Sequence, residues 1–213
     1  MPKPAEILAK MSQPLPELTL VIQAGGESRR MGQDKALLLF RGQPLIKRLI
    51  ERLSPLAQET VIATNRPAAF AAYGLRTASD ARPGLGALNG LYTALHSARY
   101  PFVAVVACDM PFANPKLLAY QAALLGIRKC DAVVPRSAEG WESFHAVYRR
   151  DHCLPLIEKA LKAEKRRVDA WFSEAEMCFM LPDEVRRHDP SGLAFVNVNT
   201  PEEFAAAEAM KGG

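Results

Sequence analysis

Apolar segments of strand length alternate with longer helical patterns along most of this chain. The strand-like segments are rich in β-branched residues and occupy residues 18–24, 59–64, 102–108 and 131–135. Ten or more residues with helical periodicity lie between successive segments. This alternation predicts a mostly parallel, Rossmann-like sheet with helices on both faces, a three-layer α/β/α arrangement. With 213 residues, 49% of them hydrophobic, the chain is long enough for a single domain with one sizeable core.

The helical patterns are expected to form helices at residues 44–57, 86–98, 114–126, 151–163 and 200–210. The second of these carries an apolar stripe that we expect to face the core, formed by Leu88, Leu91, Leu95 and Ala98. The last begins with a capping box, with Thr200 as N-cap and Glu203 three residues later, and with Pro201 at its first position. Residues 142–150 and 176–181 could be antiparallel strands. We therefore expect a small antiparallel part in the sheet.

Charge and cysteine usage exclude several classes of protein. The net charge is only +4 and no long block of Lys or Arg occurs, so we expect no nucleic-acid or membrane partner. The most basic run, residues 162–169, is expected to be a solvated helix face. No apolar run approaches the ~20 residues of a membrane span. The four cysteines lie more than twenty residues apart (Cys108, Cys130, Cys153 and Cys178), a spacing typical of reduced thiols in a cytoplasmic protein.

The first 17 residues lack the apolar region and the cleavage site of a signal peptide. They contain several prolines and precede the first strand pattern. We expect residues 1–17 to form a flexible leader and residues 18–213 to form the domain.

Residues 21–38, VIQAGGESRRMGQDKALL, run from a strand pattern into two glycines and three cations. Glycines leave backbone N–H groups unshielded, so a phosphate can approach them closely. Arg29, Arg30 and Lys35 add positive charge that suits phosphate oxygens. Two glycines alone could form a plain turn, but three cations in the same loop favour phosphate binding. The spacing matches neither a P-loop nor the dinucleotide-binding G-x-G-x-x-G pattern.

Asp109 follows the uncharged run 102–108 directly, and Pro111 closes the segment. Ligands of open parallel sheets bind beyond the carboxyl ends of the strands, where a carboxylate can hold Mg²⁺ against a phosphate. A lone Asp at this place could equally cap the next turn. Together with the glycine loop, it favours a metal site. Cys108 is expected to be a small core residue rather than a nucleophile.

Two further polar positions are open to two interpretations each. Asp80 precedes a glycine-rich connection into a helix, where it could bind a ligand or open a turn before Pro83. In residues 195–204, FVNVNTPEEF, apolar residues alternate with Asn, so Asn197 and Asn199 are expected on one face of a short strand. These carboxamides could bind a polar ligand or satisfy loop backbone.

Four motifs resemble those of the nucleotidyltransferase-like superfamily, and particularly of the MobA family of molybdenum cofactor guanylyltransferases. Residues 24–37, AGGESRRMGQDKAL, are similar to the family signature A-G-G-x-S-x-R-M-G-x-D-K. CDMPF at 108–112 resembles its metal-binding C-D-x-P segment, and SDARPGLGALNGL at 79–91 its second nucleotide loop. FVNVNTPEEF resembles its motif near the C-terminus. Four motifs in the family's order are far more specific than any one of them.

The resemblance implies an Mg²⁺-dependent enzyme that transfers GMP from GTP to the terminal phosphate of molybdopterin and releases pyrophosphate. It also implies a site: Gln23, Ala24, Gly25 and Gly26 along the nucleotide, Arg30 and Lys35 on its phosphates, Asp80 on the nucleoside, Asp109 on Mg²⁺, and Asn197 and Asn199 on the pterin-phosphate side. Arg30, Lys35 and Asp109 would carry catalysis. The attacking phosphate is already anionic, so no strong general base is needed, and we expect His145 to be structural. Proteins that insert or receive the cofactor would make transient contacts.

Two departures leave the base selection open. Gln23 replaces the leucine usual in L-A-G-G, and the second loop reads PGLGALNG where many relatives have P-G-P-L-A-G. A cytidylyltransferase acting on the same cofactor is therefore an alternative. Two others are a related enzyme acting on a sugar or isoprenoid phosphate, and a non-catalytic nucleotide-binding module that works through a partner protein.

Overall fold

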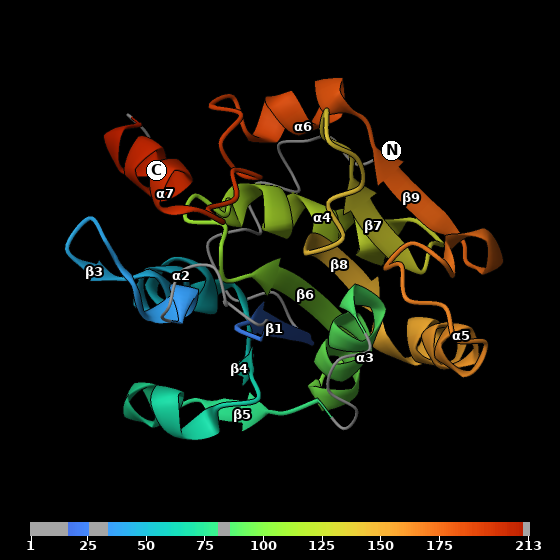
Figure 1. Ribbon diagram of the computed structural model, residues 1–213. Coiled ribbons are helices and arrows are strands. Elements are labelled where there is room, and N and C mark those ends of the chain that lie inside the picture. Colours follow the sequence, from blue (N-terminus) through green and yellow to red (C-terminus); the bar gives the residue numbers. More distant parts are fainter. Residues whose placement is uncertain (1–16, 26–33, 81–85, 211–213) are drawn as a thin grey trace.

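The computed structural model describes residues 17–25, 34–80 and 86–210. In this part of the chain, seven strands form one sheet in the order β5-β4-β1-β6-β8-β7-β9, and β2 and β3 form a separate hairpin (Figure 1). The strands of the large sheet are β1 (Leu18–Gln23), β4 (Glu59–Ala63), β5 (Arg76–Ala78), β6 (Phe102–Ala107), β7 (Ala132–Pro135), β8 (His145–Arg149) and β9 (Met177–Met180). The four strands predicted from apolar runs are β1, β4, β6 and β7.

The sheet is mostly parallel, as predicted. β1 pairs in parallel with both β4 and β6, and β4 pairs in parallel with β5. β8 is antiparallel to both of its neighbours, β6 and β7, so it is the antiparallel part expected at residues 142–150. The expectation for residues 176–181 was wrong in direction, because β9 runs parallel to β7. The reason is that residues 163–176, which follow α5, return the chain to the end of the sheet where β7 begins: the N–H of Asp131 donates to the oxygen of Glu176 at 2.7 Å.

Helices cover both faces of the sheet (Figure 1). On one face lie α2 (Leu45–Leu53), α4 (Pro115–Ile127) and α6 (Pro182–His188), and on the other lie α3 (Ala87–Ser97) and α5 (Arg150–Lys162). Side chains of β1 alternate between the two cores: Leu20 and Ile22 join the first, and Val21 joins the second. The predicted apolar stripe of α3 is buried. The three-layer arrangement is thus confirmed.

A third, smaller core holds α7 (Pro201–Ala209) against the β2–β3 hairpin, whose strands are Leu39–Phe40 and Gln43–Pro44. The ring of Phe40 contacts Phe112 and Phe204 edge-on, with centroid distances of 5.7 and 5.5 Å. Such aromatic pairs add to the stabilisation from buried area. The cluster brings the C-terminal helix next to the segment that follows β6.

The short strand expected around Asn197 and Asn199 is absent from the described residues, so that prediction was wrong. Residues 193–199 instead cross the carboxyl end of β6 as irregular backbone. The amide N–H of Val198 donates to the backbone oxygen of Asp109 at 2.9 Å, and the Val198 side chain is buried in the third core. The polarity alternates here because every second side chain packs inward, although no strand of the described residues pairs with this segment.

The capping box at the start of α7 is confirmed. Thr200 Oγ1 accepts from the Glu203 N–H at 3.2 Å, and Glu203 Oε2 accepts from the backbone N–H of Thr200 at 3.2 Å. We expect Thr200→Ala to lower the free energy of unfolding by about 1 kcal/mol, because an orphan N–H at the helix start loses its acceptor. Thr200→Ser should retain most of the free energy of unfolding that Thr200→Ala loses. Urea unfolding of the three proteins measures this, and equal midpoints would contradict it.

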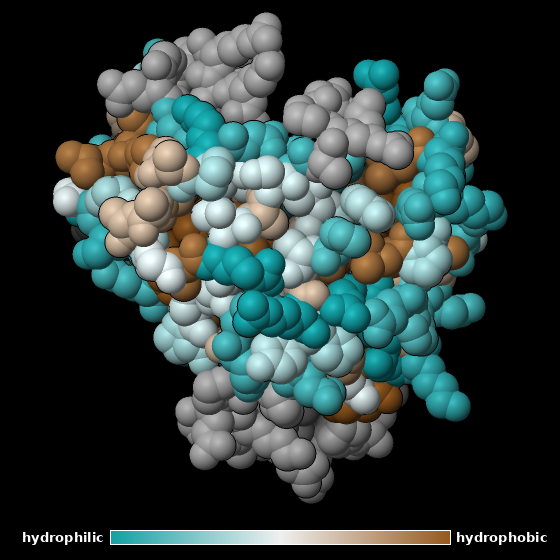
Figure 2. All heavy atoms as spheres, turned by 90° about the horizontal axis from the view of Figure 1, so that it is seen from below, coloured by the Kyte–Doolittle hydropathy of each residue, from teal (hydrophilic) through white to brown (hydrophobic). Residues whose placement is uncertain are grey.

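The surface of one face is shown in Figure 2, where hydrophilic side chains predominate and hydrophobic ones occupy separate areas. Among the described helices, none combines the length and the apolar character that a bilayer crossing requires. All four cysteines are free thiols.

Candidate active site

The carboxyl ends of four parallel strands meet at one edge of the sheet, and most predicted site residues lie there. Gln23 at the end of β1 pairs with Ala63 of β4 on one side and with Ala107 of β6 on the other. The N–H of Cys108 donates to the backbone oxygen of Gln23 at 2.9 Å. Asp109 is the next residue. The register therefore places the start of the glycine loop directly beside the predicted metal-binding acid.

Lys35, Asp109 and Asn199 form the central cluster of this edge. Lys35 is the first residue of the short 3-10 helix η2 (Lys35–Leu37). Its Nζ donates to Asn199 Oδ1 at 2.8 Å and lies 4.0 Å from Asp109 Oδ2. The side chains of Lys35 and Asp109 are 17% and 25% exposed, so both remain accessible to a ligand. Three motifs that are far apart in the sequence thus meet at one ammonium group.

The carboxyl of Asp109 is poorly solvated. Burial raises the pKa of Asp109 above its usual value, and Lys35 partly offsets this by stabilising the anion. Glu203 adds a smaller effect in the same direction as burial. A carboxylate in this situation gains from an additional cation, because the ammonium of Lys35 compensates the burial only in part.

The two C-terminal asparagines have different partners. Asn199 accepts from Lys35, as described above, whereas Asn197 Nδ2 donates to the backbone oxygen of Phe195 at 3.1 Å. Of the two interpretations open for this motif, binding of a polar ligand suits Asn199, and satisfying loop backbone describes the contact of Asn197. A ligand contact of Asn197 stays a prediction.

Asp80 lies after β5 and is held by two neighbouring elements. Its Oδ1 accepts from Thr93 Oγ1 of α3 at 2.6 Å, and its Oδ2 accepts from Asn65 Nδ2 at 3.3 Å. The backbone N–H of Asp80 also donates to Asn65 Oδ1 at 2.8 Å. Sequence reasoning missed Asn65. The available signal was a polar residue just beyond the apolar run 59–64, at the same strand edge as Asp109.

Gln23 points its side chain toward α3. Its Nε2 donates to the backbone oxygen of Gly90, which lies one turn into that helix. A Cβ at position 90 would lie 3.6 Å from the amide atoms of Gln23, which is an ordinary van der Waals contact, so this approach does not require a glycine. At least one donor of the amide is therefore used inside the protein.

Several predicted phosphate ligands lie outside the described residues. These are Gly26, Arg29 and Arg30. Ala24 and Gly25 are described: Ala24 is buried and donates its N–H to the oxygen of Ala63 at 2.8 Å, and Gly25 is exposed.

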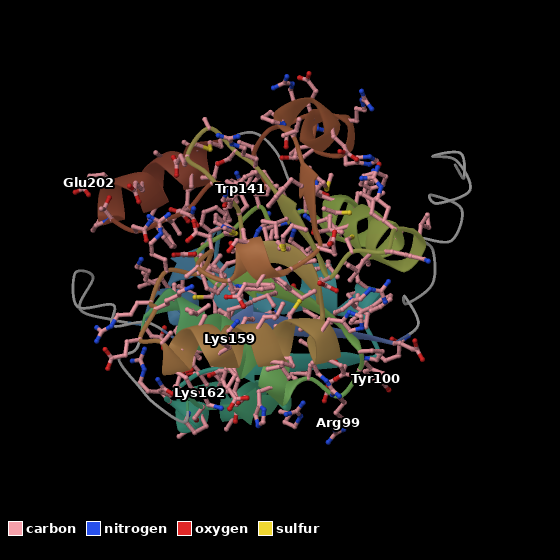
Figure 3. The ribbon with its side chains drawn as sticks, turned by 90° about the vertical axis from the view of Figure 1, so that its right-hand side faces the viewer. Arg99, Tyr100, Trp141, Lys159, Lys162 and Glu202 are labelled. Carbon is pink, nitrogen blue, oxygen red and sulfur yellow. The ribbon has the colours of Figure 1, made fainter. Side chains whose placement is uncertain are left out.

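In the basic run at residues 162–169, residues 162–167 are exposed as expected, but only Lys162 belongs to α5. Glu164 adopts a left-handed conformation with φ of 59°, and the N–H of Lys165 bonds back to the oxygen of Ala160 at 3.0 Å, which ends the helix. Figure 3 shows Lys162 near this end of α5. The oxygen of Arg166 then accepts from the N–H of Leu88 at 3.3 Å, so this loop contacts the start of α3.

His145 is a core residue, and Cys108 is a partly buried residue that packs against the first core. The ring of His145 is fully buried in β8, and its Nε2 accepts from the N–H of Asn114 at 3.0 Å. Burial lowers the pKa of His145 to about 4, so the ring is neutral at neutral pH. Burial likewise raises the pKa of Cys108, which keeps the thiol protonated. Both observations agree with the structural roles expected for these residues.

Comparison with protein families assigns this chain to a known class. The family model of the MobA-like NTP transferase domain matches residues 20–177, which include the first glycine loop, Asp80 and Asp109. The chain belongs to this family. It is therefore a nucleotidyltransferase, and the resemblance found in the four motifs is confirmed.

Relatives of this MobA-like chain align over nearly their whole length. A protein of Pelotomaculum thermopropionicum named "Probable molybdenum cofactor guanylyltransferase" is 34% identical over 91% of this chain and 93% of its own. The molybdenum cofactor guanylyltransferase of Desulfosudis oleivorans is 32% identical over 90% and 95%. The crystal structure of molybdopterin-guanine dinucleotide biosynthesis protein A from Archaeoglobus fulgidus has a TM-score of 0.78 at 25% identity, over 89% and 96% of the two chains. The first two of these relatives are named as transferases, which favours catalysis over a purely binding role.

Nucleotidyltransferases of the MobA-like family generally use a divalent metal, and the donor set of the site fits one. No group of three or more His, Cys, Asp or Glu side chains in the described residues could hold a metal by itself. Mg²⁺ is commonly bound by one or two carboxylates, with waters and substrate phosphates completing its shell. The accessible carboxylate of Asp109 beside Lys35 suits an ion that is shared with a phosphate.

Proposed function

We propose that this MobA-like enzyme transfers GMP from GTP to the terminal phosphate of molybdopterin, forming molybdopterin guanine dinucleotide and pyrophosphate with Mg²⁺ as cofactor. The contact of Lys35 with both Asn199 and Asp109 carries the proposal. It joins the predicted phosphate loop, the predicted metal-binding acid and the predicted acceptor motif in one place. A reaction between two phosphates requires such a convergence of positive charge and oxygen ligands.

The order of the strands supports a placement of the two substrates on opposite sides of β1. Asp80 and Asn65 follow β5 and β4, on one side of β1, whereas Asp109 follows β6 on the other side. Asn199 lies on the β6 side as well, because the N–H of the neighbouring Val198 donates to the backbone oxygen of Asp109. We therefore assign the nucleoside to the β4–β5 side and the acceptor phosphate to the Asn199 side, with the triphosphate between them.

In the proposed reaction, an oxygen of the molybdopterin phosphate attacks the α-phosphorus of GTP. The bond between that phosphorus and the bridging oxygen breaks, and the electron pair leaves with pyrophosphate. The ammonium of Lys35 would stabilise negative charge on the phosphates, and Asp109 would hold Mg²⁺, which supplies further charge neutralisation when it is bound. The nucleophile carries no proton that must be removed, so the neutral, buried His145 need not act as a base.

Gln23, Ala24, Gly25, Gly26 and Arg30 remain predicted nucleotide ligands, and Asn197 a predicted molybdopterin ligand. The side chain of Gln23 is hydrogen-bonded to Gly90, and this contact does not select between guanine and cytosine. A cytidylyltransferase is therefore the second candidate. The names of the relatives favour guanine. A cytoplasmic setting and transient contacts with proteins that insert or receive the cofactor also stay predictions.

The test is pyrophosphate release from mixtures of the protein, Mg²⁺, molybdopterin and each nucleoside triphosphate in turn. We expect release with GTP and little with CTP or ATP. Release with CTP but not GTP would overturn the guanine assignment and support the cytidylyltransferase. Release with sugar or isoprenoid phosphates, and none with molybdopterin, would overturn the assigned acceptor.

A further inference from the structure

Both described ends of the first glycine loop are attached to the end of β4 and the residues just after it. At the start of the loop, the N–H of Ala24 donates to the oxygen of Ala63 at 2.8 Å. After it, the carboxylate of Asp34 forms an ion pair with the guanidinium of Arg66. Arg66 is itself held, because its N–H donates to Thr64 Oγ1 at 3.1 Å. The end of β4 therefore fixes where the loop leaves the sheet and where it returns.

Asp34 fixes the backbone of Lys35. Asp34 is the N-cap of η2: its Oδ1 accepts from the N–H of Ala36 at 3.2 Å, and its backbone oxygen accepts from the N–H of Leu37 at 2.9 Å. Lys35 is the residue between these contacts, and the next side chain, Ala36, is fully buried. A shift of Asp34 would therefore shift the Cα of Lys35 and the ammonium that reaches Asn199.

The two partners of the ion pair differ in exposure. The side chain of Asp34 is 7% exposed, whereas that of Arg66 is 54% exposed. An arginine that loses its partner here would be hydrated by solvent. A buried carboxylate that loses its partner would remain an uncompensated anion, which is the costly case. That anion would also lie one residue from Lys35, where a triphosphate is proposed to bind.

We propose that Arg66 is a positioning residue that holds Lys35 in its phosphate-binding place through the carboxylate of Asp34. The inference rests on the proposed function, since it assigns Lys35 to the phosphates of the nucleotide. It makes a specific statement about charge: Arg66 is needed because Asp34 is negative, and it need not touch the nucleotide. Arg66 should therefore become dispensable once Asp34 is neutral.

A double-mutant cycle tests this statement, with KM for GTP and kcat measured for Arg66→Ala, Asp34→Asn and the double variant. We expect Arg66→Ala to raise KM for GTP by about tenfold or more, because an anion is exposed to the triphosphate and the start of η2 loses its anchor. Asp34→Asn should change KM by only about two- to threefold, because Asn is also a good N-cap. The double variant should resemble Asp34→Asn. Arg66→Lys should restore part of the affinity lost in Arg66→Ala, because it retains the charge.

Arg76→Ala is the matched control. Arg76 pairs at 2.7 Å with Glu59, whose side chain is 10% exposed, at the opposite end of the same strand β4. This variant also removes an arginine from a buried carboxylate, so it should lower the melting temperature. It should leave KM for GTP unchanged, because Glu59 lies at the sheet edge away from the site.

The outcomes separate the proposal from its alternatives. If removal of Arg66 raised KM equally in the presence of Asp34 and of Asn at position 34, the proposal would be overturned, since Arg66 would then contact the nucleotide directly. An equal rise in Arg66→Ala and Arg76→Ala would also overturn it, because the effect would be one of general stability. If the unmodified protein releases no pyrophosphate from any substrate mixture, the proposed reaction fails. The same double-mutant cycle is then carried out with the dissociation constant of Mg²⁺–GTP, measured by calorimetry, in place of KM. An absence of coupling between Asp34 and Arg66 in that cycle overturns the positioning role.

Discussion

Asp109→Asn is expected to abolish turnover while nucleotide binding remains measurable. The substitution keeps the size of the side chain and removes the negative charge that is proposed to hold Mg²⁺ against the phosphates. A metal ion stabilises the transition state of such a transfer by several kcal/mol, so the rate should fall by roughly three orders of magnitude or more. The measurement is pyrophosphate release at saturating GTP and molybdopterin, together with calorimetric binding of GTP with and without Mg²⁺.

The calorimetric binding of GTP tests whether Asp109 acts through Mg²⁺. In the unmodified protein, Mg²⁺ should strengthen the binding of GTP, and in Asp109→Asn that dependence should largely disappear. Asp183→Asn is the control, because this carboxylate is 82% exposed and pairs only with its own helix neighbour Arg186 among the described residues. Turnover within about tenfold of normal in Asp109→Asn would contradict the metal assignment.

Lys35→Ala should produce the second largest loss, with kcat/KM lowered by about 10²- to 10³-fold. The ammonium of Lys35 is the cation nearest to Asp109 among the described ion pairs, and its contact with Asn199 joins the two predicted substrate sides. Without it, negative charge on the phosphates has one fewer fixed partner. Lys35→Arg should restore only part of the activity, because a planar guanidinium needs a different geometry from a compact ammonium.

Steady-state kinetics with GTP as the varied substrate measure this loss. Lys47→Ala serves as the control, since Lys47 lies on α2, is half exposed and pairs with Glu51 of the same helix. Its kcat/KM should be unchanged. If Lys35→Ala changed neither kcat nor KM, the role of the cluster in phosphate binding would be refuted, whereas an effect on KM alone would indicate binding without transition-state stabilisation.

Most of the fold could be predicted from local patterns. The apolar runs that became β1, β4, β6 and β7 are buried on both faces of the sheet, so their sequences carry little polar interruption. The stripe of α3 and the capping box of α7 were likewise readable, because their contacts lie within a few residues. The direction of β9 was not readable, because it depends on the return of residues 163–176 to the end of the sheet where β7 begins.

The candidate site divides in the same way. The sequence motifs identified Lys35, Asp109 and Asn199 separately. Because the ends of parallel strands converge, Asp109 was also expected to lie near the glycine loop. The expected strand near Asn199 was wrong, because the third core, not a sheet ladder, holds that segment. Asn65 and Arg66 belong to no sequence motif, and their place beside the site is visible only in their contacts with Asp80 and Asp34.

The sequence by itself determined the class of fold, the family and the residue types that a phosphate and a metal require, because periodicity and motif spacing act over short stretches of chain. Only the tertiary structure decided which of those residues meet. Lys35 and Asn199 are 164 positions apart, and Asp34 and Arg66 are 32 apart. Their contacts depend on strand order and on the packing of α7, which arise from many weak interactions across the whole domain and leave no local pattern at the residues they join.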